Sequence, residues 1–279
     1  MRTYLFPGQG AQKAGMGRQL FQDFPEYVVQ ADRILGYSVE ELCLDDPLQQ
    51  LVQTQFTQPA LYTVSCLSYL KKTQRDPFAG QVCAAGHSVG EYAALFAAGC
   101  FSFEDGLRLV QKRGECMSEV KDGGMAAVIG KPADEIERLL YQYAYDSIDT
   151  ANYNSREQTV ISGMAQEIMD VRTVFEESGV RMYVVLKVSG AFHSRYMLKT
   201  AERFREFLDS FELSEPRFPV ISNVHARPHL RSEMKDTLAR QIASPVRWSD
   251  SIKYLNGLGE MEYEELGESR VLTNLLRQQ

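Results

Sequence analysis

The segment Gly86-His87-Ser88-Val89-Gly90 places a serine between two glycines, after the apolar residues 82–85 and before the helix-like run 91–98. This arrangement is typical of a nucleophile elbow, a sharp turn from a strand into a helix that exposes the serine hydroxyl. Glycines are needed because the two backbones come too close for a Cβ atom. The turn also aims backbone N–H groups at an oxyanion formed beside the serine. The segment predicts Ser88 as a nucleophile; five residues alone leave an ordinary glycine turn open.

A serine nucleophile needs a base, and neutral imidazole has a pKa suited to this task near neutral pH. The chain contains four histidines, His87, His193, His225 and His229. His87 adjoins the serine, so on a strand it points to the opposite face and is expected to support the elbow. His225 and His229 lie in a polar, proline-containing segment that is predicted to be a loop. His193 follows the β-rich run 183–188, where catalytic groups are common, and is the candidate base; a purely structural histidine is the alternative.

The 279-residue chain has an ordinary globular composition, with 44% hydrophobic and 24% charged residues. Its length allows one large domain or two modest ones. Residues 1–7 turn polar too soon for a signal peptide, and no apolar stretch approaches the ~20 residues that a membrane span needs. We therefore expect a cytoplasmic protein that contacts no membrane.

Cysteine usage and charge exclude two further classes of function. The five cysteines are odd in number, scattered and without metal-ligand spacing, so we expect buried thiols in a reducing compartment and no metal site. The net charge of −7 argues against a nucleic-acid partner.

The elements that must position the candidate residues alternate between strands and helices. Before the elbow we expect a strand over 3–6, a glycine-rich loop over 7–12, and helices over 20–35 and 60–72. A helix over 103–119, with an amphipathic apolar pattern, follows the elbow.

Residues 121–124 (Lys-Asp-Gly-Gly) are expected to join two parts of the chain. The pattern beyond them predicts strands and helices over 125–129, 134–143, 159–162, 165–178 and 181–188. This β-α-β-α-β order, with a further short strand near 148–151, suits a compact subdomain of ferredoxin-like type. Elements at 196–211, 220–222, 231–242 and beyond are expected to return to the first sheet. The order therefore predicts an α/β protein with an insertion.

Several separated blocks recur in order with the spacing of one known family. They are Phe6-Pro7-Gly8-Gln9-Gly10-Ala11-Gln12, Thr54-Gln55-Phe56-Thr57-Gln58-Pro59-Ala60, Gly86-His87-Ser88-Val89-Gly90-Glu91, Lys112-Arg113-Gly114, Asn152-Tyr153-Asn154-Ser155, Gly190-Ala191-Phe192-His193-Ser194 and Gln241-Ile242-Ala243-Ser244-Pro245-Val246. From residue 3 to about residue 275, the chain resembles the malonyl-CoA:acyl-carrier-protein transacylases. It is more closely similar to the discrete trans-acting acyltransferases of polyketide synthases, of the disorazole synthase type.

The resemblance implies a large α/β-hydrolase-like subdomain interrupted by a small ferredoxin-like one, with the active site in the cleft between them. The large, discontinuous subdomain is expected to comprise 1–122 and 189–279, and the small one 123–188. This agrees with the element order found from the residues.

The resemblance also implies the catalytic roles. Ser88 is the nucleophile, and His193 is the general base and then the general acid. The third member of the relay is the backbone carbonyl of Gln241, which accepts from the imidazole. The oxyanion hole consists of the backbone N–H groups of Val89 and Gln9; the alternative for Gln9 is a turn residue in a Gly-Gln-Gly bend.

Four further residues are expected to contact the substrate. Arg113 stands 25 positions after Ser88, as in transacylases that carry dicarboxylic acyl groups. Its guanidinium can hold a malonyl carboxylate through two parallel hydrogen bonds; on spacing alone, a solvated helix charge is the alternative. Phe192 is expected to limit the space at the acyl α-carbon, or else to pack in the core. Gln58 and Asn154 match polar positions near the cleft, and either one could instead brace the loops.

One block departs from the family pattern. Near the C-terminus the family usually has Gly-Pro-Gly or Gly-Pro-His, whereas this chain has Gly267-Glu268-Ser269. The departure puts in doubt the local turn and a contact with the carrier protein, and does not involve the catalytic pair.

The resemblance implies an enzyme, an [acyl-carrier-protein] S-malonyltransferase. It would move a malonyl group from malonyl-CoA, through a Ser88 ester, to the phosphopantetheine thiol of an acyl carrier protein or of a polyketide synthase carrier domain. Coenzyme A enters as a thioester substrate, no cofactor is bound, and relatives lead us to expect a monomer. A carrier is usually acidic, so we expect it to dock on a basic patch, with Lys71, Lys72, Arg195 and Lys199 as candidates.

Three alternatives remain open at this point. An editing acyl hydrolase of the same fold would let water attack the Ser88 ester and would not need a carboxylate clamp. A docking subunit without catalysis is disfavoured because Ser88 and His193 are both present. A generic esterase would need an acid between them in sequence, for which Asp105, Asp122 and Asp146 are available.

Overall fold

β1 (Arg2–Phe6) and β2 (Val82–Gly86) form the centre of a parallel sheet in the computed structural model, which describes residues 1–188 and 190–279. β7 (Val220–Ile221) pairs with β2 and β8 (Glu262–Glu265) pairs with β1, giving the order β7-β2-β1-β8. All five residues of β1 are buried, as expected for a parallel strand covered on both faces. The strands predicted near 3–6 and 220–222, and the return of the C-terminal part to the first sheet, are confirmed.

Successive residues of β1 belong to two different cores on the two faces of this sheet. Tyr4 and Phe6 pack into the main core, whereas Leu5 packs with Trp248 in a second one. The helices that pack into the main core include α1 (Arg18–Asp23), α2 (Pro25–Leu35), α3 (Val39–Leu44), α4 (Thr54–Arg75), α5 (Gly90–Ala97) and α6 (Phe103–Ser118). The second core lies against α12 (Trp248–Asn256) and α13 (Val271–Leu276).

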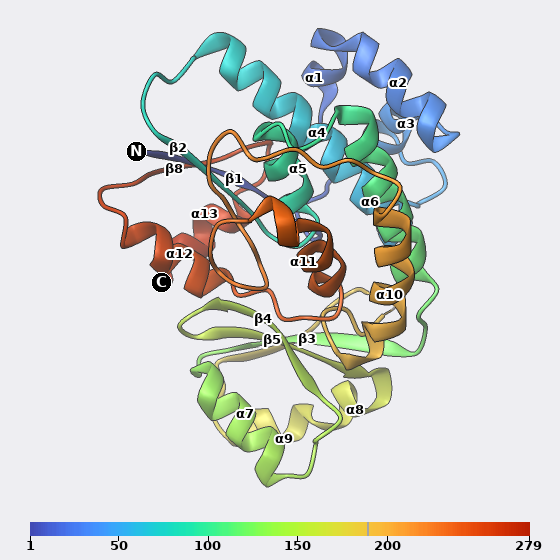
Figure 1. Cartoon of the computed structure of the whole chain (residues 1–279). Helices are drawn as coiled ribbons and strands as arrows, with labels where there is room; N and C mark the ends of the chain where they lie inside the picture. Colours follow the sequence, from blue (N-terminus) through green and yellow to red (C-terminus); the bar gives the residue numbers. More distant parts are fainter. Residues whose placement is uncertain (189) are drawn as a thin grey trace.

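A second, antiparallel sheet lies in the lower part of Figure 1. Its strands are β3 (Gly123–Ile129), β4 (Asp149–Ser155), β5 (Gln158–Met164) and β6 (Met182–Val185), in the order β4-β5-β3-β6. The helices α7 (Ala133–Gln142), α8 (Ala165–Asp170) and α9 (Arg172–Glu177) cover one face (Figure 1). The β-α-β-β-α-β order is that of a ferredoxin-like unit, so the α/β fold class is confirmed.

The two sheets share the main core. Ala126 and Val128 of β3 pack against α7 and α9, whereas Met125 and Ala127 belong to the main core. Backbone hydrogen bonds also join β4 to the segment after α11, from Tyr153 N–H to Val246 O (2.9 Å) and back from Val246 N–H to Ala151 O (2.8 Å).

Two α-helices complete the part of the chain that the structure describes, α10 (Leu198–Leu208) and α11 (Met234–Gln241). Each follows a short 3₁₀ helix, at Arg195–Met197 and Arg231–Glu233 respectively. Figure 1 shows α10 running from the first sheet's helices down to the second sheet. Ser189, where we expect the second segment of the large subdomain to begin, lies outside the described residues.

Several predicted boundaries are wrong. The helix predicted over 20–35 is two helices, because Pro25 starts α2 and its ring prevents α1 from continuing. The helix predicted over 60–72 begins earlier, at Thr54, and contains Pro59. The Thr57 hydroxyl donates to Leu51 O (2.6 Å) and fixes its first turn. The helix predicted over 165–178 divides into α8 and α9, and the strand predicted over 181–188 ends at Val185.

The unusual segment 267–269 makes a turn of its own. Gly267 has a φ of +94°, a conformation that favours glycine, and Glu268 Oε1 accepts from Gly17 N–H (3.1 Å). Elsewhere in the described chain, all five cysteines are buried and free, as expected. None of the described helices has the length and apolar character that a membrane crossing requires.

Candidate active site

The nucleophile elbow predicted at residues 86–90 is a tight turn between β2 and α5. Ser88 has a φ of +51°, which a non-glycine residue adopts only when its surroundings impose it. A Cβ atom at Gly86 would lie 2.0 Å from the carbonyl carbon of Gly90, and one at Gly90 would lie 2.1 Å from Phe6 O. These distances explain why both positions are glycine.

The imidazole of His193 lies next to Ser88, with 2.8 Å between Nε2 and the serine Oγ. Its Nδ1 faces two backbone carbonyl oxygens, Gln241 O at 2.8 Å and Ser244 O at 3.1 Å. A carbonyl oxygen only accepts hydrogen bonds, so Nδ1 must carry the proton and Nε2 is free to accept from the serine hydroxyl. None of the three acids that a generic esterase could use, Asp105, Asp122 or Asp146, is hydrogen-bonded to this ring among the described residues.

His193 is held as a neutral imidazole. Burial lowers its pKa to about 3, with a further contribution from the positive charge of Arg113. Hydrogen bonds to the two carbonyls act in the opposite direction and do not outweigh burial. The ring is therefore unprotonated over the ordinary pH range, as a general base must be.

Arg113 of α6 is 1% exposed and lies against the nucleophile. Its Nη2 donates to Ser88 Oγ (3.1 Å) and to Gln241 Oε1 (2.8 Å), and its Nη1 donates to Gln58 Oε1 (2.6 Å). The face of the Tyr92 ring lies 5.7 Å from the guanidinium carbon. Burial lowers the pKa of Arg113 from its very high ordinary value. All acceptors that the guanidinium contacts among the described residues are neutral, so it is a buried charge without a directly paired carboxylate.

A cavity of about 80 Å³ connects these groups. Its lining includes Ser88, His193, Arg113, Gln58, Phe192, Gln9 and Val89. The backbone N–H groups of Gln9 and Val89 donate to no other atom of residues 1–188 and 190–279, so both are available to an oxyanion. The structure thus brings together eight of the nine residues singled out from the sequence, counting Gln241 through its bond to His193.

Asn154 is the exception, because it does not line the cavity. Its Oδ1 is 2.9 Å from Nε2 of His87, the histidine expected to support the elbow. The nearby Asn152 lines the cavity instead, and its buried Oδ1 has no partner in the described part of the chain.

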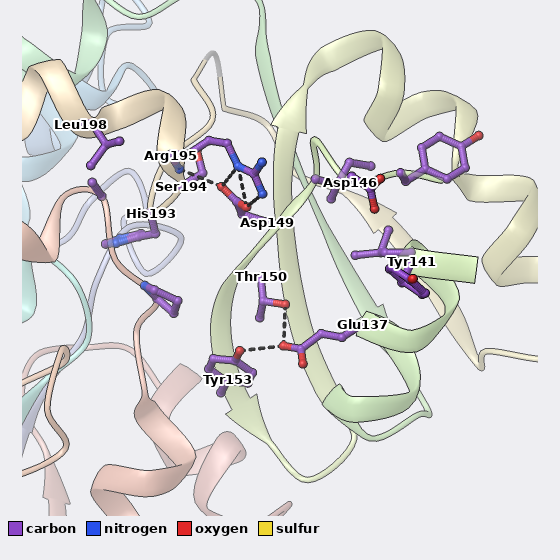
Figure 2. Close-up of a pocket in the computed structure, with 15 residues that line it drawn as sticks. Glu137, Tyr141, Asp146, Asp149, Thr150, Tyr153, His193, Ser194, Arg195 and Leu198 are labelled. Carbon is purple, nitrogen blue, oxygen red and sulfur yellow. Dashed lines mark hydrogen bonds and ion pairs between the residues drawn. The ribbon is translucent and has the colours of Figure 1, made fainter. Parts of the chain in front are cut away.

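A wider groove of about 540 Å³ is lined by His193 and lies between α7 and β4 on one side and residues 193–198 with Ala243 and Pro245 on the other. Figure 2 shows Ser194, Arg195 and Leu198 along one wall, and residues of α7 and β4 along the other. Arg195 forms an ion pair with Asp149 across the groove, and Glu137 accepts from the hydroxyls of Thr150 (3.0 Å) and Tyr153 (2.7 Å). His193 lines both the cavity and the groove, whereas Ser88 lines the cavity alone.

Sequence reasoning missed three residues that hold the elbow. Asn223 accepts from Ser88 N–H (2.7 Å) and donates to Gly86 O (2.7 Å) through its side chain. Glu91, which is fully buried, accepts from Asn223 N–H and from His229 Nε2. His229 was predicted to lie in a loop, and no local signal marked it as buried. The three contacts join segments more than 130 positions apart, which the spacing of residues cannot indicate.

Comparison with known proteins identifies relatives over the whole chain. Residues 3–263 match the family described as acyl transferase domain. PksC of Bacillus subtilis (strain 168), a polyketide biosynthesis malonyl CoA-acyl carrier protein transacylase, is 54% identical over 277 residues, which cover 99% of this chain and 96% of PksC. The crystal structure of malonyl CoA-acyl carrier protein transacylase from Burkholderia pseudomallei matches with a TM-score of 0.97 and 47% identity, covering 100% of this chain and 97% of that one. A malonyl-transacylase in complex with its type II polyketide synthase acyl-carrier protein matches with a TM-score of 0.93 and 31% identity. The match covers 99% of this chain and 92% of that one.

Proposed function

Because the chain belongs to the acyl transferase family, we propose that Ser88 carries a malonyl group from coenzyme A to the phosphopantetheine thiol of an acyl carrier protein. The protein is a malonyl CoA-acyl carrier protein transacylase of polyketide biosynthesis, of the trans-acting type. It needs no cofactor, since the coenzyme A thioester is the substrate.

One observation supports the malonyl group most strongly, the buried guanidinium of Arg113 beside Ser88. A buried cation without a carboxylate partner is costly unless an anion joins it. Malonyl is an acyl group that carries such an anion, and a guanidinium can hold it with two parallel hydrogen bonds. Gln58 then orients the guanidinium through its bond to Nη1, and Phe192 limits the space at the acyl α-carbon.

The first half-reaction forms the serine ester. His193 Nε2 takes the proton of the Ser88 hydroxyl as Oγ attacks the thioester carbonyl carbon, and the carbonyl oxygen becomes an oxyanion. When the C–S bond breaks, the imidazolium returns this proton to the departing coenzyme A sulfur. The carbonyl of Gln241 stabilises the imidazolium less than a buried carboxylate would. A milder base suffices because a thioester is an activated acyl donor.

The second half-reaction runs through the same groups. His193 takes the thiol proton of the carrier's phosphopantetheine, the sulfur attacks the ester carbonyl, and Ser88 Oγ leaves and regains the proton. In both halves the N–H groups of Gln9 and Val89 hold the oxyanion, each contributing ~3 kcal/mol to its stabilisation. The groove, which His193 also lines, is the approach that we propose for both pantetheine arms.

An acyl carrier protein is the partner. We propose that the enzyme acts as a monomer in the cytoplasm, and that it binds neither membranes nor nucleic acid; the net charge of −7 supports the last point. The expected basic docking patch is weakened by internal pairing. Lys71 pairs with Asp23, Lys72 with Asp76 and Glu264, and Arg195 with Asp149, which leaves Lys199.

We also propose that residues 1–122 and 189–279 form an α/β-hydrolase-like subdomain and that residues 123–188 form a ferredoxin-like one. The two separate sheets support this division. The bond between Asn154 and His87 supports a bracing role for Asn154 at the elbow, in place of a contact with the acyl group.

The test uses malonyl-CoA labelled in the malonyl group, with and without a holo acyl carrier protein. We expect label on the carrier and little free malonate, because an incoming thiol takes the acyl group faster than water. Free malonate released faster than the carrier is loaded would instead show the editing hydrolase. Carrier that lacks the phosphopantetheine arm is the control and should take up no label.

A further inference from the structure

Glu91, the second residue of α5, is a fully buried carboxylate that does not touch the reacting atoms. Its Oε1 accepts from His229 Nε2 (2.6 Å). Its Oε2 accepts from Asn223 N–H (3.0 Å) and from Gln241 Nε2 (2.8 Å). Three donors thus hold one carboxylate at a single position, although none of them is an arginine or lysine.

The side chain of Gln241 lies between this carboxylate and Arg113. Its Oε1 accepts from Arg113 Nη2 (2.8 Å), and its Nε2 donates to Glu91 Oε2 (2.8 Å) and to Ser88 O (3.0 Å). The guanidinium only donates and the carboxylate only accepts, so the amide can take only this orientation. A single amide group therefore separates two buried opposite charges.

We propose that Glu91 is the buried counter-charge of Arg113, and that the Gln241 side chain is the spacer that prevents their direct pairing and leaves the guanidinium for the acyl carboxylate. This inference rests on the proposed function of the site. It adds a role for the Gln241 side chain that is separate from the role of its backbone carbonyl beside His193.

The energetics favour this arrangement over two alternatives. Without Glu91, the buried guanidinium would have no negative charge near it to offset its desolvation. If the carboxylate touched the guanidinium, the internal ion pair would occupy the nitrogens that a malonyl carboxylate needs, and substrate would have to displace it. Because one amide group separates the Glu91 carboxylate from the guanidinium, the carboxylate offsets the cost of desolvating Arg113 and leaves its N–H donors free for substrate. Glu91 and the Gln241 side chain are in this sense positioning and specificity groups.

The experiment compares Gln241→Glu with Gln241→Met, a neutral residue of similar length. Both keep the backbone carbonyl that orients His193. The measured quantity is the ratio of kcat/KM for malonyl-CoA to kcat/KM for acetyl-CoA, in transfer to a holo carrier protein. We expect Gln241→Glu to lower this ratio about tenfold or more, because its carboxylate pairs with Arg113 directly, and Gln241→Met to lower it less.

Two measurements separate this effect from loss of fold. The thermal unfolding midpoint reports stability, and the rate of Ser88 labelling by a fluorophosphonate probe, which carries no carboxylate, reports the Ser88–His193 pair. If Gln241→Glu does not fold, Glu91→Gln takes its place. That variant removes the counter-charge without adding a carboxylate at the guanidinium, so the ratio should rise.

Equal loss of malonyl and acetyl transfer in Gln241→Glu would overturn the inference, and so would an equal fall of the ratio in Gln241→Met. In the substitute experiment, a ratio that does not rise in Glu91→Gln would overturn it. Failure of the proposed function looks different, since the unmodified enzyme would then load no malonyl group onto the carrier.

Discussion

Ser88 and His193, the proposed nucleophile and base, share an uncommon backbone conformation, with φ of +51° and +58° respectively. Such a conformation costs a non-glycine residue about 1–3 kcal/mol, so neighbouring groups must hold it. Ser88 N–H donates to Asn223 Oδ1 (2.7 Å), and His193 N–H donates to Ile242 O (3.1 Å). The 2.8 Å contact between the two side chains is therefore imposed by the surrounding fold.

The charge of Arg113 should decide which acyl group is transferred. We expect Arg113→Ala to lower kcat/KM for malonyl-CoA roughly 10- to 100-fold more than for acetyl-CoA, since charge-assisted hydrogen bonds contribute about 1.5–3 kcal/mol. Arg113→Lys, which keeps the charge and loses the planar fork, is the control and should give an intermediate ratio. Equal losses for both acyl groups would contradict the clamp.

The lowered pKa of His193 predicts an unusual pH profile. In the free enzyme the imidazole becomes protonated only as the pH approaches or falls below its pKa of about 3. The value of kcat/KM should therefore not fall as the pH drops through about 6.5. The acylation rate of Ser88 is best measured with acetyl-CoA, whose acyl group does not titrate. An acid limb centred near 6.5 would show that the ring is not desolvated as described.

The proposed nucleophile and base, and the Gln241 carbonyl that contacts the base, were predicted from the sequence, whereas most of the side chains that hold them were not. The elbow pattern and the few histidines singled out Ser88 and His193, because chemistry restricts which side chains can serve. Asn223, Glu91 and His229 act through contacts that no local pattern encodes. Their roles became visible only once the fold brought their segments together.

At the level of elements, the turn from β2 into α5 depends on close backbone approach. We expect Gly90→Ala to abolish acylation and to lower stability by about 1–3 kcal/mol, since its Cβ atom would lie 2.1 Å from Phe6 O. Gly257→Ala is the matched control. It lies at an exposed helix end, where the nearest atom would be 3.2 Å from the new Cβ. Intact mass after incubation with malonyl-CoA and urea unfolding give the two readouts.

The types and order of the elements could be read from the sequence, whereas several boundaries could not. Apolar spacing continues across Phe24 and Pro25, so the pattern does not show that α1 and α2 are separate helices. The helix predicted over 60–72 begins six residues earlier, at Thr54, and contains Pro59. In the first case the ring of Pro25 outweighs the continuing apolar pattern, and in the second the helix runs on through Pro59.

At the scale of the whole molecule, the site lies where the two sheets share one core. β3 is apolar on both faces, with Met125 and Ala127 toward the main core and Ala126 and Val128 away from it. Its sequence therefore predicts a buried strand without showing which face packs toward the first sheet's core. Residues from both parts line the cavity, including Asn152 of β4 and Gln58 of α4, so the active site requires the whole fold.

Burial of a neutral histidine also affects stability. His193 has a pKa of about 3 in the folded protein, against about 6.5 unfolded, so between these values the unfolded chain binds one more proton. The free energy of unfolding should therefore fall as the pH drops through this window, by up to about 1.4 kcal/mol per pH unit. The lowered pKa of the buried His87 acts in the same direction.

His193→Asn isolates this contribution, because asparagine does not titrate and tolerates positive φ. Urea unfolding at about pH 6 and about pH 5 should show a smaller loss of stability in the variant than in the unmodified protein. If both proteins lost the same free energy of unfolding between these pH values, His193 would have the same pKa in the folded and the unfolded protein.

The intact mass of the protein after brief mixing with malonyl-CoA tests the central claim most directly. We expect a mass increase of one malonyl group, located on Ser88, that disappears on addition of a holo acyl carrier protein as the carrier gains the same mass. Ser88→Ala should show no increase. A stable adduct on another residue, or carrier loading by Ser88→Ala, would contradict the account.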